Sequence, residues 1–271
     1  MNDLAELRAM AVRDRLAGRY RAAYDRLAAA VEQAAARLGD DSVEVAYLRN
    51  ELAVTCKALA RYDEAESLYR RALATLEVAS GPDHPDVAGV LHNLGGLAHA
   101  RGDHPTAAAL ARRGLEIRRD ALGDDHPDVA ADRAALAPIV HALGDLDDAE
   151  ELLVQVLATY ERTLGPEHHE IAVTLNNLAA VHHDRGDLDR AAATYRRSLD
   201  MRSALLGPDH PELATTLVNL GVLEASRGRV GAAVEALRRA IALLEPAVPA
   251  DHPTLVAARE ELDLVRPVAG E

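Results

Sequence analysis

The sequence of 271 residues contains no phenylalanine, no tryptophan and one cysteine, Cys56. A single cysteine excludes an internal disulfide and a cysteine-cluster metal site, so we expect Cys56 to be a small buried residue. Aromatic residues are 3% of the chain and the formal net charge is −14. The sequence therefore lacks both the basic surface and the stacking aromatics that nucleic-acid binding requires.

Long apolar runs are also missing. The opening stretch MNDLAELRAMAVRDR alternates charged with apolar positions, which indicates neither a secretion signal nor a membrane-spanning segment. One lysine, Lys57, stands against many arginines, and alanine is abundant, a bias that suggests a high-GC bacterial genome. We expect a cytoplasmic protein that binds neither nucleic acid nor membrane.

What the sequence does contain is internal repetition with a period of 42 residues, which places equivalent residues in columns. One column holds the histidines His84, His126, His168, His210 and His252. Two glycine columns hold Gly39, Gly81, Gly123, Gly165 and Gly207, and Gly18, Gly102, Gly144, Gly186 and Gly228, with Ala60 in the missing place of the second. Two columns without exception are Leu52, Leu94, Leu136, Leu178, Leu220 and Leu262, and Ala23, Ala65, Ala107, Ala149, Ala191 and Ala233.

Each repeat reads as two antiparallel helices, here called A and B. In the fifth repeat Pro211 suits the first helical position, and the apolar stripe that follows has the spacing of an amphipathic helix. Gly228 suits the left-handed turn after that helix, and a second stripe begins at Val230. Small residues in both helices, such as Gly95 and Gly221, let helix axes approach closely.

These features predict an all-α solenoid of antiparallel helix pairs that spans residues 1–271 as a single array. Its expected parts are an N-terminal pair (3–37), repeats at 38–79, 80–121, 122–163, 164–205 and 206–247, a capping helix (251–265) and a tail (266–271).

The unit LGPDHPxxATTLxNLGxL followed by RGxxxxAxxxLRRAI resembles the tetratricopeptide repeat in its kinesin-light-chain-type form, over nearly the whole chain. The resemblance implies a right-handed superhelix whose A helices line a concave groove. It also implies an adaptor, scaffold or regulator that binds a protein or peptide, and such proteins are not usually catalysts.

Candidate groove residues follow from helical geometry at 100° per residue. Positions −2, +2 and +5 from the leucine column point away from it, and −1 lies on the flank. The predicted binding residues are Asn50, Glu51, Lys57, His92, Asn93, His99, His141, Asn176, Asn177, His183, Asp184 and Asn219. The resemblance implies that an asparagine at −1 contacts the main chain of a peptide, because a carboxamide both donates and accepts. The alternative is an exposed helix face without a role. We expect Asn176, Asn177 and Asn219 to be the strongest candidates.

Other polar columns have competing interpretations. The histidines of the DHP motifs suggest metal binding, but successive repeats hold them too far apart for one ion, so helix capping or packing is favoured and we expect no metal and no cofactor. His99, His141 and His183 either form an exposed polar face or tune the binding of an acidic ligand with pH. The arginine pairs of the B helices suggest pairing with surface carboxylates.

The third repeat departs most from the others. Pro138 falls inside helix A, where it predicts a kink, and both groove positions are alanine, so the groove either continues or splits into two sites. Arg49 and Arg133 replace a leucine of the apolar stripe.

No nucleophile or acid–base pair is placed for catalysis, so we expect no enzyme. The predicted function is a peptide- or partner-binding scaffold, and the alternative is a regulator whose superhelix changes shape on binding. Exposed helix stripes also allow a homodimer.

Overall fold

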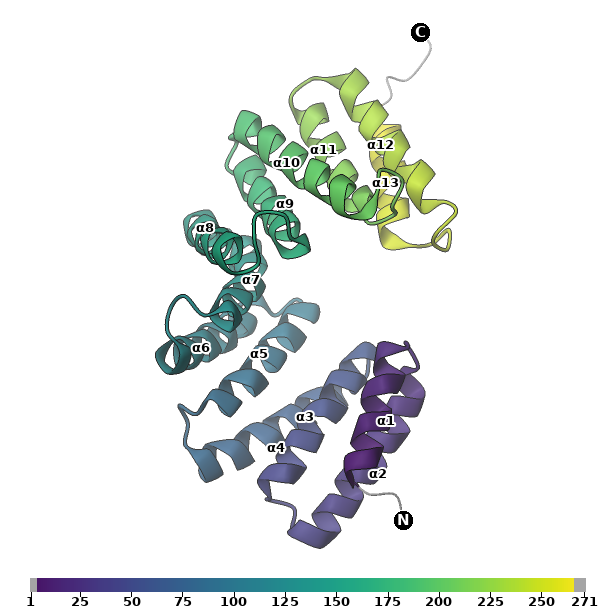
Figure 1. The fold of residues 1–271 in the computed structure, drawn as a ribbon. Coiled ribbons are helices and arrows are strands. Elements are labelled where there is room, and N and C mark those ends of the chain that lie inside the picture. Colours follow the sequence, from purple (N-terminus) through teal and green to yellow (C-terminus); the bar gives the residue numbers. More distant parts are fainter. Residues whose placement is uncertain (1–3, 266–271) are drawn as a thin grey trace. The chain divides into compact units, whose positions relative to one another are not determined.

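The computed structural model describes residues 4–265, which form thirteen α-helices and no strand (Figure 1). The helices are α1 (Leu4–Leu16), α2 (Tyr20–Leu38), α3 (Val43–Ala58), α4 (Tyr62–Ser80), α5 (Pro85–Ala100), α6 (His104–Leu122), α7 (Pro127–Ala142), α8 (Leu146–Thr163), α9 (His169–Asp184), α10 (Leu188–Leu206), α11 (Leu213–Ser226), α12 (Val230–Leu244) and α13 (Pro253–Val265). The predicted all-α repeat solenoid is confirmed. The predicted tail, 266–271, lies outside the described residues.

The chain divides into two compact units, one ending at Ile139 and the other beginning at Val140. In the first unit α1 packs on α2, α3 on α4 and α5 on α6, and the A helices α3 and α5 also touch. In the second unit α9 packs on α10 and α11 on α12, and the A helix α11 touches both α9 and α13. Neighbouring A helices within a unit therefore share one face. The predicted repeat boundaries and the single array stay predictions.

The two glycine columns end helices, as their spacing predicts. All ten glycines have φ between +71° and +95°, a region that residues with a Cβ rarely adopt. Ala60, which replaces glycine in the second column, is the one non-glycine residue with positive φ among those described, at +57°. Its strained backbone shows that the repeat geometry overrides local preference.

The leucine and alanine columns form the core of each unit. Every alanine of its column is 0% exposed, and the leucines are at most 8% exposed. A Cβ on Gly95 would lie 3.3 Å from the Ala107 carbonyl oxygen, and one on Gly221 would lie 2.7 Å from Leu237 Cγ. The predicted close approach of the paired helices is confirmed at both glycines.

Four of the five histidines in the histidine column cap A helices, as favoured over metal binding, whereas His252 Nδ1 is buried without a hydrogen-bond partner among the described residues. Their Nδ1 atoms accept hydrogen bonds from the backbone N–H two residues later at 3.1–3.3 Å, in His84, His126, His168 and His210. The expected start of the fifth A helix was wrong by two residues, because α11 begins at Leu213 rather than Pro211. The N–H groups of Leu213 and Ala214 donate to the carbonyl oxygens three residues earlier, those of His210 and Pro211. The chain therefore enters α11 through a turn of the 3-10 type, which is wound more tightly than an α-helix.

The third A helix, α7, continues through Pro138 for 16 residues, the same length as α5 and α9. Pro138 therefore does not end the helix, although it removes a backbone donor. The predicted kink and the predicted division of the groove stay predictions.

Candidate functional site on the A helices

Several side-chain hydrogen bonds between neighbouring A helices join residues 43 positions apart. Five contacts share this spacing: Arg8–Glu51 (2.7 Å), Asn50–Asn93 (2.9 Å), His141–Asp184 (2.7 Å), Asn176–Asn219 (3.3 Å) and His183–Ser226 (3.4 Å). We call this set of contacts the ladder. It arises because a residue at −2 or +5 on one A helix faces the residue one position further on in the next repeat. Eight of the twelve predicted binding residues belong to it.

In the first unit, the ladder residues Asn50 and Glu51 both have side-chain partners on neighbouring A helices. Asn50 accepts from Asn93 Nδ2 through its Oδ1, while Glu51 receives the Arg8 guanidinium. His92 bonds Asp132 at 2.8 Å, and this carboxylate is only 4% exposed. Asp132 was missed by the sequence reasoning, although an acidic residue in an apolar stripe position is a usable signal.

The ladder of the second unit contains the asparagines that the sequence favoured. Asn176 is only 9% exposed and its Oδ1 accepts from Asn219 Nδ2, so it is less accessible than predicted and holds Asn219 in place. Asn177 is half-buried and makes no side-chain hydrogen bond to another described residue. The residue 43 positions before it is Ala134, which has no polar side-chain atom. Asn177 therefore keeps both its donors and its acceptor available.

Lys57 and His99 occupy the +5 positions of the first unit, and His104 of α6 adjoins His99. His99 Nδ1 is 3.2 Å from His104 Nδ1, and burial, together with the charges of His104 and Lys57, lowers the pKa of His99. Burial likewise lowers the pKa of Lys57. His104 was missed by the sequence reasoning, although it is the only histidine in a column otherwise made of Tyr20, Tyr62, Leu146, Leu188 and Val230.

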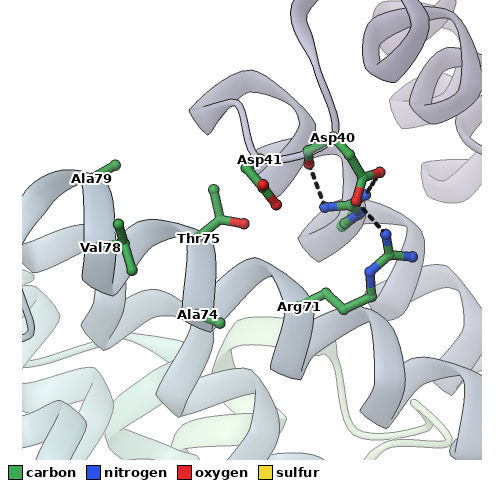
Figure 2. Close-up of a pocket in the computed structure, with 8 residues that line it drawn as sticks. Asp40, Asp41, Arg71, Ala74, Thr75, Val78 and Ala79 are labelled. Carbon is green, nitrogen blue, oxygen red and sulfur yellow. Dashed lines mark hydrogen bonds and ion pairs between the residues drawn. The ribbon is translucent and has the colours of Figure 1, made fainter.

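A pocket of about 390 Å³ lies between α4 and the loop that precedes α3 (Figure 2). Buried Arg49 bonds the Asp40 carbonyl oxygen at 2.8 Å and also its carboxylate, which Arg71 contacts at 2.6 Å. Arg133 binds Asp124 in the same way. None of the predicted binding residues lines this pocket. Its arginines form internal ion pairs, so we place the candidate site on the A-helix face that carries the ladder instead.

Three of the four arginine pairs of the B helices contain ion-paired surface residues, as predicted, whereas in the fourth Arg239 donates to the Pro208 carbonyl oxygen. Arg70 binds Glu66 at 2.7 Å, Arg113 binds Glu77 at 2.8 Å and Arg197 binds Glu161 at 2.8 Å. Each of these three contacts involves partly exposed side chains, so each contributes little to stability.

Cys56 is fully buried, as predicted, and burial raises the pKa of its thiol to about 12. Such a thiol stays protonated at neutral pH and is a poor nucleophile. Within residues 4–265, no helix combines the length and the apolar character needed to cross a bilayer.

Helix pairs with a recurring left-handed glycine, a buried alanine and a polar A-helix face define a helical repeat protein of the interaction-scaffold class. The model of the family described as tetratricopeptide repeat matches residues 4–77, 46–120, 86–162, 132–204 and 170–245. The chain therefore belongs to the tetratricopeptide repeat family, whose members are generally non-catalytic scaffolds. No curated protein matches the chain.

Solved structures of the same architecture include kinesin-light-chain-like proteins, which confirms the predicted repeat type. BtubC (BKLC) from P. vanneervenii is 25% identical, with a TM-score of 0.67 over 93% of this chain and 95% of that one. A putative kinesin light chain from Podosopora anserina is 24% identical, with a TM-score of 0.64 over 76% of this chain and 99% of that one. YrrB, described as a TPR protein with an unusual peptide-binding site, is 17% identical, with a TM-score of 0.51 over 85% of this chain and 97% of that one.

Proposed function

We propose that the protein is a non-catalytic scaffold that binds an extended peptide segment of a partner protein along its A helices. The observation that carries the proposal is the carboxamide of Asn177, which is half-buried and has no hydrogen-bond partner within residues 4–265. A peptide unit presents one N–H donor and one C=O acceptor, and a carboxamide satisfies both.

Asn219 supports the same interpretation from the next A helix. Its Nδ2 is held by Asn176 Oδ1, which fixes the side chain and leaves its own Oδ1 to accept from a ligand N–H. A preorganised acceptor loses little conformational entropy on binding. Asn177 and Asn219 occupy the same position in consecutive repeats, so they would contact successive stretches of one extended chain. The peptide-binding site ascribed to YrrB makes peptide recognition on this fold reasonable.

The test uses a peptide selected from a random 12-residue display library against the full chain. We expect Asn177→Ala to weaken binding of that peptide about tenfold, or about 1.4 kcal/mol. Asn219→Ala should have a similar effect, and both variants should keep the wild-type helicity.

Gln33→Ala is the matched control, because Gln33 is an exposed carboxamide side chain on the B helix α2. It should leave affinity unchanged. Wild-type affinity in Asn177→Ala, measured by calorimetry, would contradict the assignment of this side chain to the peptide site.

The regulatory alternative predicts a different readout. A regulator whose superhelix changes shape should alter its small-angle scattering profile when the selected peptide is added. A passive scaffold should keep the same profile in the presence of the peptide.

A further inference from the structure

Lys57 is the one lysine of the chain, and it is unusually placed for a cation in an acidic protein. Its side chain is half-buried and has no carboxylate partner among the described residues. Arginines of the same unit, such as Arg70, Arg71 and Arg113, are by contrast ion-paired. Removing a cation from water without a partner is unfavourable, so the position of Lys57 calls for another explanation.

The ammonium group does not fold back on its own helix. Lys57 Nζ lies 3.0 Å from the position that a Cβ would take on Gly96 of α5. A lysine in the last turn of α3 would otherwise be explained by its attraction to the helix C-terminus. Its reach to the neighbouring A helix indicates a role on the shared face.

Gly96 is the residue that makes room for the ammonium. Glycine inside a helix is unfavourable relative to alanine, and Gly96 does not have the positive φ that would require it. The same column in the other repeats holds Val54, Pro138, Ala180 and Val222. The repeat that follows the sole lysine is therefore the one with glycine at this position, where the lysine ammonium group lies.

Two imidazoles adjoin this lysine, and the charge of Lys57 acts on the nearer of them, His99. His99 comes from the last turn of α5 and His104 from the first residue of α6. With their Nδ1 atoms 3.2 Å apart, one ring donates to the other, and the accepting ring keeps an Nε2–H donor. The adjoining carboxylate, Asp103, already accepts from the Thr106 backbone N–H as the cap of α6.

We propose that Lys57, His99 and His104 form a subsite that binds a carboxylate side chain, from glutamate or aspartate, of the peptide segment. The ammonium supplies the charge and the imidazole supplies a directional N–H, and none of the three side chains makes an ion pair with a carboxylate of residues 4–265. This subsite rests on the proposed function and adds to it a preference for acidic ligands.

The fourth repeat is a natural negative control for the subsite. The residues that occupy the equivalent places there are His183, Val222, Ala225 and Val230. His183 already contacts Ser226 at 3.4 Å, and two of the other three side chains are branched and apolar. The carboxylate preference therefore belongs to the first unit alone.

The test exploits the sole lysine, because lysine labelled with 13C at Cε gives a single resonance. Full-length protein is titrated with N-acetylglutamate methylamide, and with the uncharged N-acetylglutamine methylamide at equal ionic strength. We expect a saturable shift of the Lys57 resonance with the glutamate probe and at least a tenfold weaker response with the glutamine probe.

Variants separate the subsite from a general charge effect. Gly96→Ala should displace the Lys57 ammonium and weaken binding of the glutamate probe at least threefold. The same substitution should make the protein more resistant to denaturant, because alanine has a higher helix propensity than glycine. Gly89→Ala is the matched control, because it is a helix-interior glycine of α5 with nothing within 4 Å of an added Cβ. It should raise stability and leave probe binding unchanged.

The outcomes are distinct from those of the peptide test. A linear, non-saturating response to the glutamate probe, or equal responses of the wild type and Gly96→Ala, would overturn the subsite even if Asn177→Ala weakens the selected peptide. Saturation by inorganic phosphate without a response to glutamate would also overturn it in favour of a phosphate site. A specific glutamate response would stand even if the asparagine variants bind normally.

Discussion

Equivalent residues of repeats 1 and 4 lie 126 positions apart, which is three periods of 42. The two repeats share the same buried framework but carry different polar side chains on their surfaces. Leu52 and Leu178 are both buried, at 4% and 7% exposed. Asn50 and Asn176 both accept a ladder hydrogen bond from the next repeat. The framework columns are thus fixed by packing.

The polar positions beside that framework differ. Glu51 of repeat 1 is ion-paired with Arg8, whereas its equivalent Asn177 has no hydrogen-bond partner among the described residues. Lys57 of repeat 1 reaches Gly96, whereas its equivalent His183 contacts Ser226. We infer that the ladder keeps geometry constant while single substitutions set the ligand chemistry, carboxylate in the first unit and main-chain amide in the second.

The largest expected effect concerns a buried arginine. Arg49 is 2% exposed and bonds Asp40, whereas repeat 4 has Leu175 and Pro166 in the same two places. We expect Arg49→Ala to lower the free energy of unfolding by about 2–5 kcal/mol, the range for deleting a large buried side chain. Urea denaturation followed by circular dichroism measures it.

The combination found in repeat 4 supplies the control. Arg49→Leu alone leaves Asp40 without its buried partner, while adding Asp40→Pro removes the carboxylate as well. We expect the double variant to be more stable than Arg49→Leu. Equal effects of Asp40→Pro in the wild type and in Arg49→Leu would show that Asp40 and Arg49 are not coupled.

The helical framework could be predicted from the sequence because the same residue type recurs every 42 positions, and agreement among several copies is a stronger signal than any single residue. Helix pairs, turn glycines, buried leucines and the capping role of the DHP histidines all follow from local rules repeated several times. The Arg49–Asp40 pair was also within reach, since Asp124 accompanies Arg133 in the one other repeat that carries arginine. The ion pair can be recognised when two columns are compared with each other, because aspartate stands nine residues before the arginine in both repeats that carry this arginine.

The site was harder to predict. Helical geometry placed the asparagines on one face of the A helices. It did not reveal that Asn176 is buried, or that Asn177 is the one asparagine among the described residues without a side-chain hydrogen bond. Both facts depend on which residue stands on the neighbouring helix. His104 belongs to a B helix and lies outside any analysis of A-helix positions, so only the structure brings it to His99.

A smaller effect is expected at the second glycine column, where repeat 1 has Ala60 at φ +57° and repeat 4 has Gly186 at φ +88°. No atom beyond the chain neighbours lies within 4 Å of an added Cβ on Gly186, so backbone strain alone is at issue. We expect Ala60→Gly to raise the free energy of unfolding by about 1 kcal/mol and Gly186→Ala to lower it by about the same amount. Thermal and urea denaturation of both variants give the two signs, and changes of the same sign would contradict the strain at Ala60.

The smallest effect is a dependence of stability on the protonation of a buried histidine, which repeat 4 has and repeat 1 lacks. His182 is 3% exposed, bonds Glu150 at 3.3 Å and has a buried Nδ1 without a partner, whereas its equivalent in repeat 1 is Cys56. Burial lowers the pKa of His182, since protonation would create a buried N–H donor with no acceptor. Glu150 stays charged in the same range, because His182, Arg185 and Arg190 outweigh the effect of burial and lower its pKa.

The sign of this dependence follows from linkage. Above a pH of about 6.5, the ordinary histidine pKa, both the folded and the unfolded states are neutral at position 182. As pH falls below that value the unfolded chain takes up a proton that the folded chain resists, so the free energy of unfolding decreases. We expect His182→Cys to reduce the loss of stability between pH 7 and pH 5, measured by urea denaturation at three pH values. His183→Cys, on the more exposed neighbour, should keep the wild-type slope, and an unchanged slope in His182→Cys would mean that another group carries the acid sensitivity.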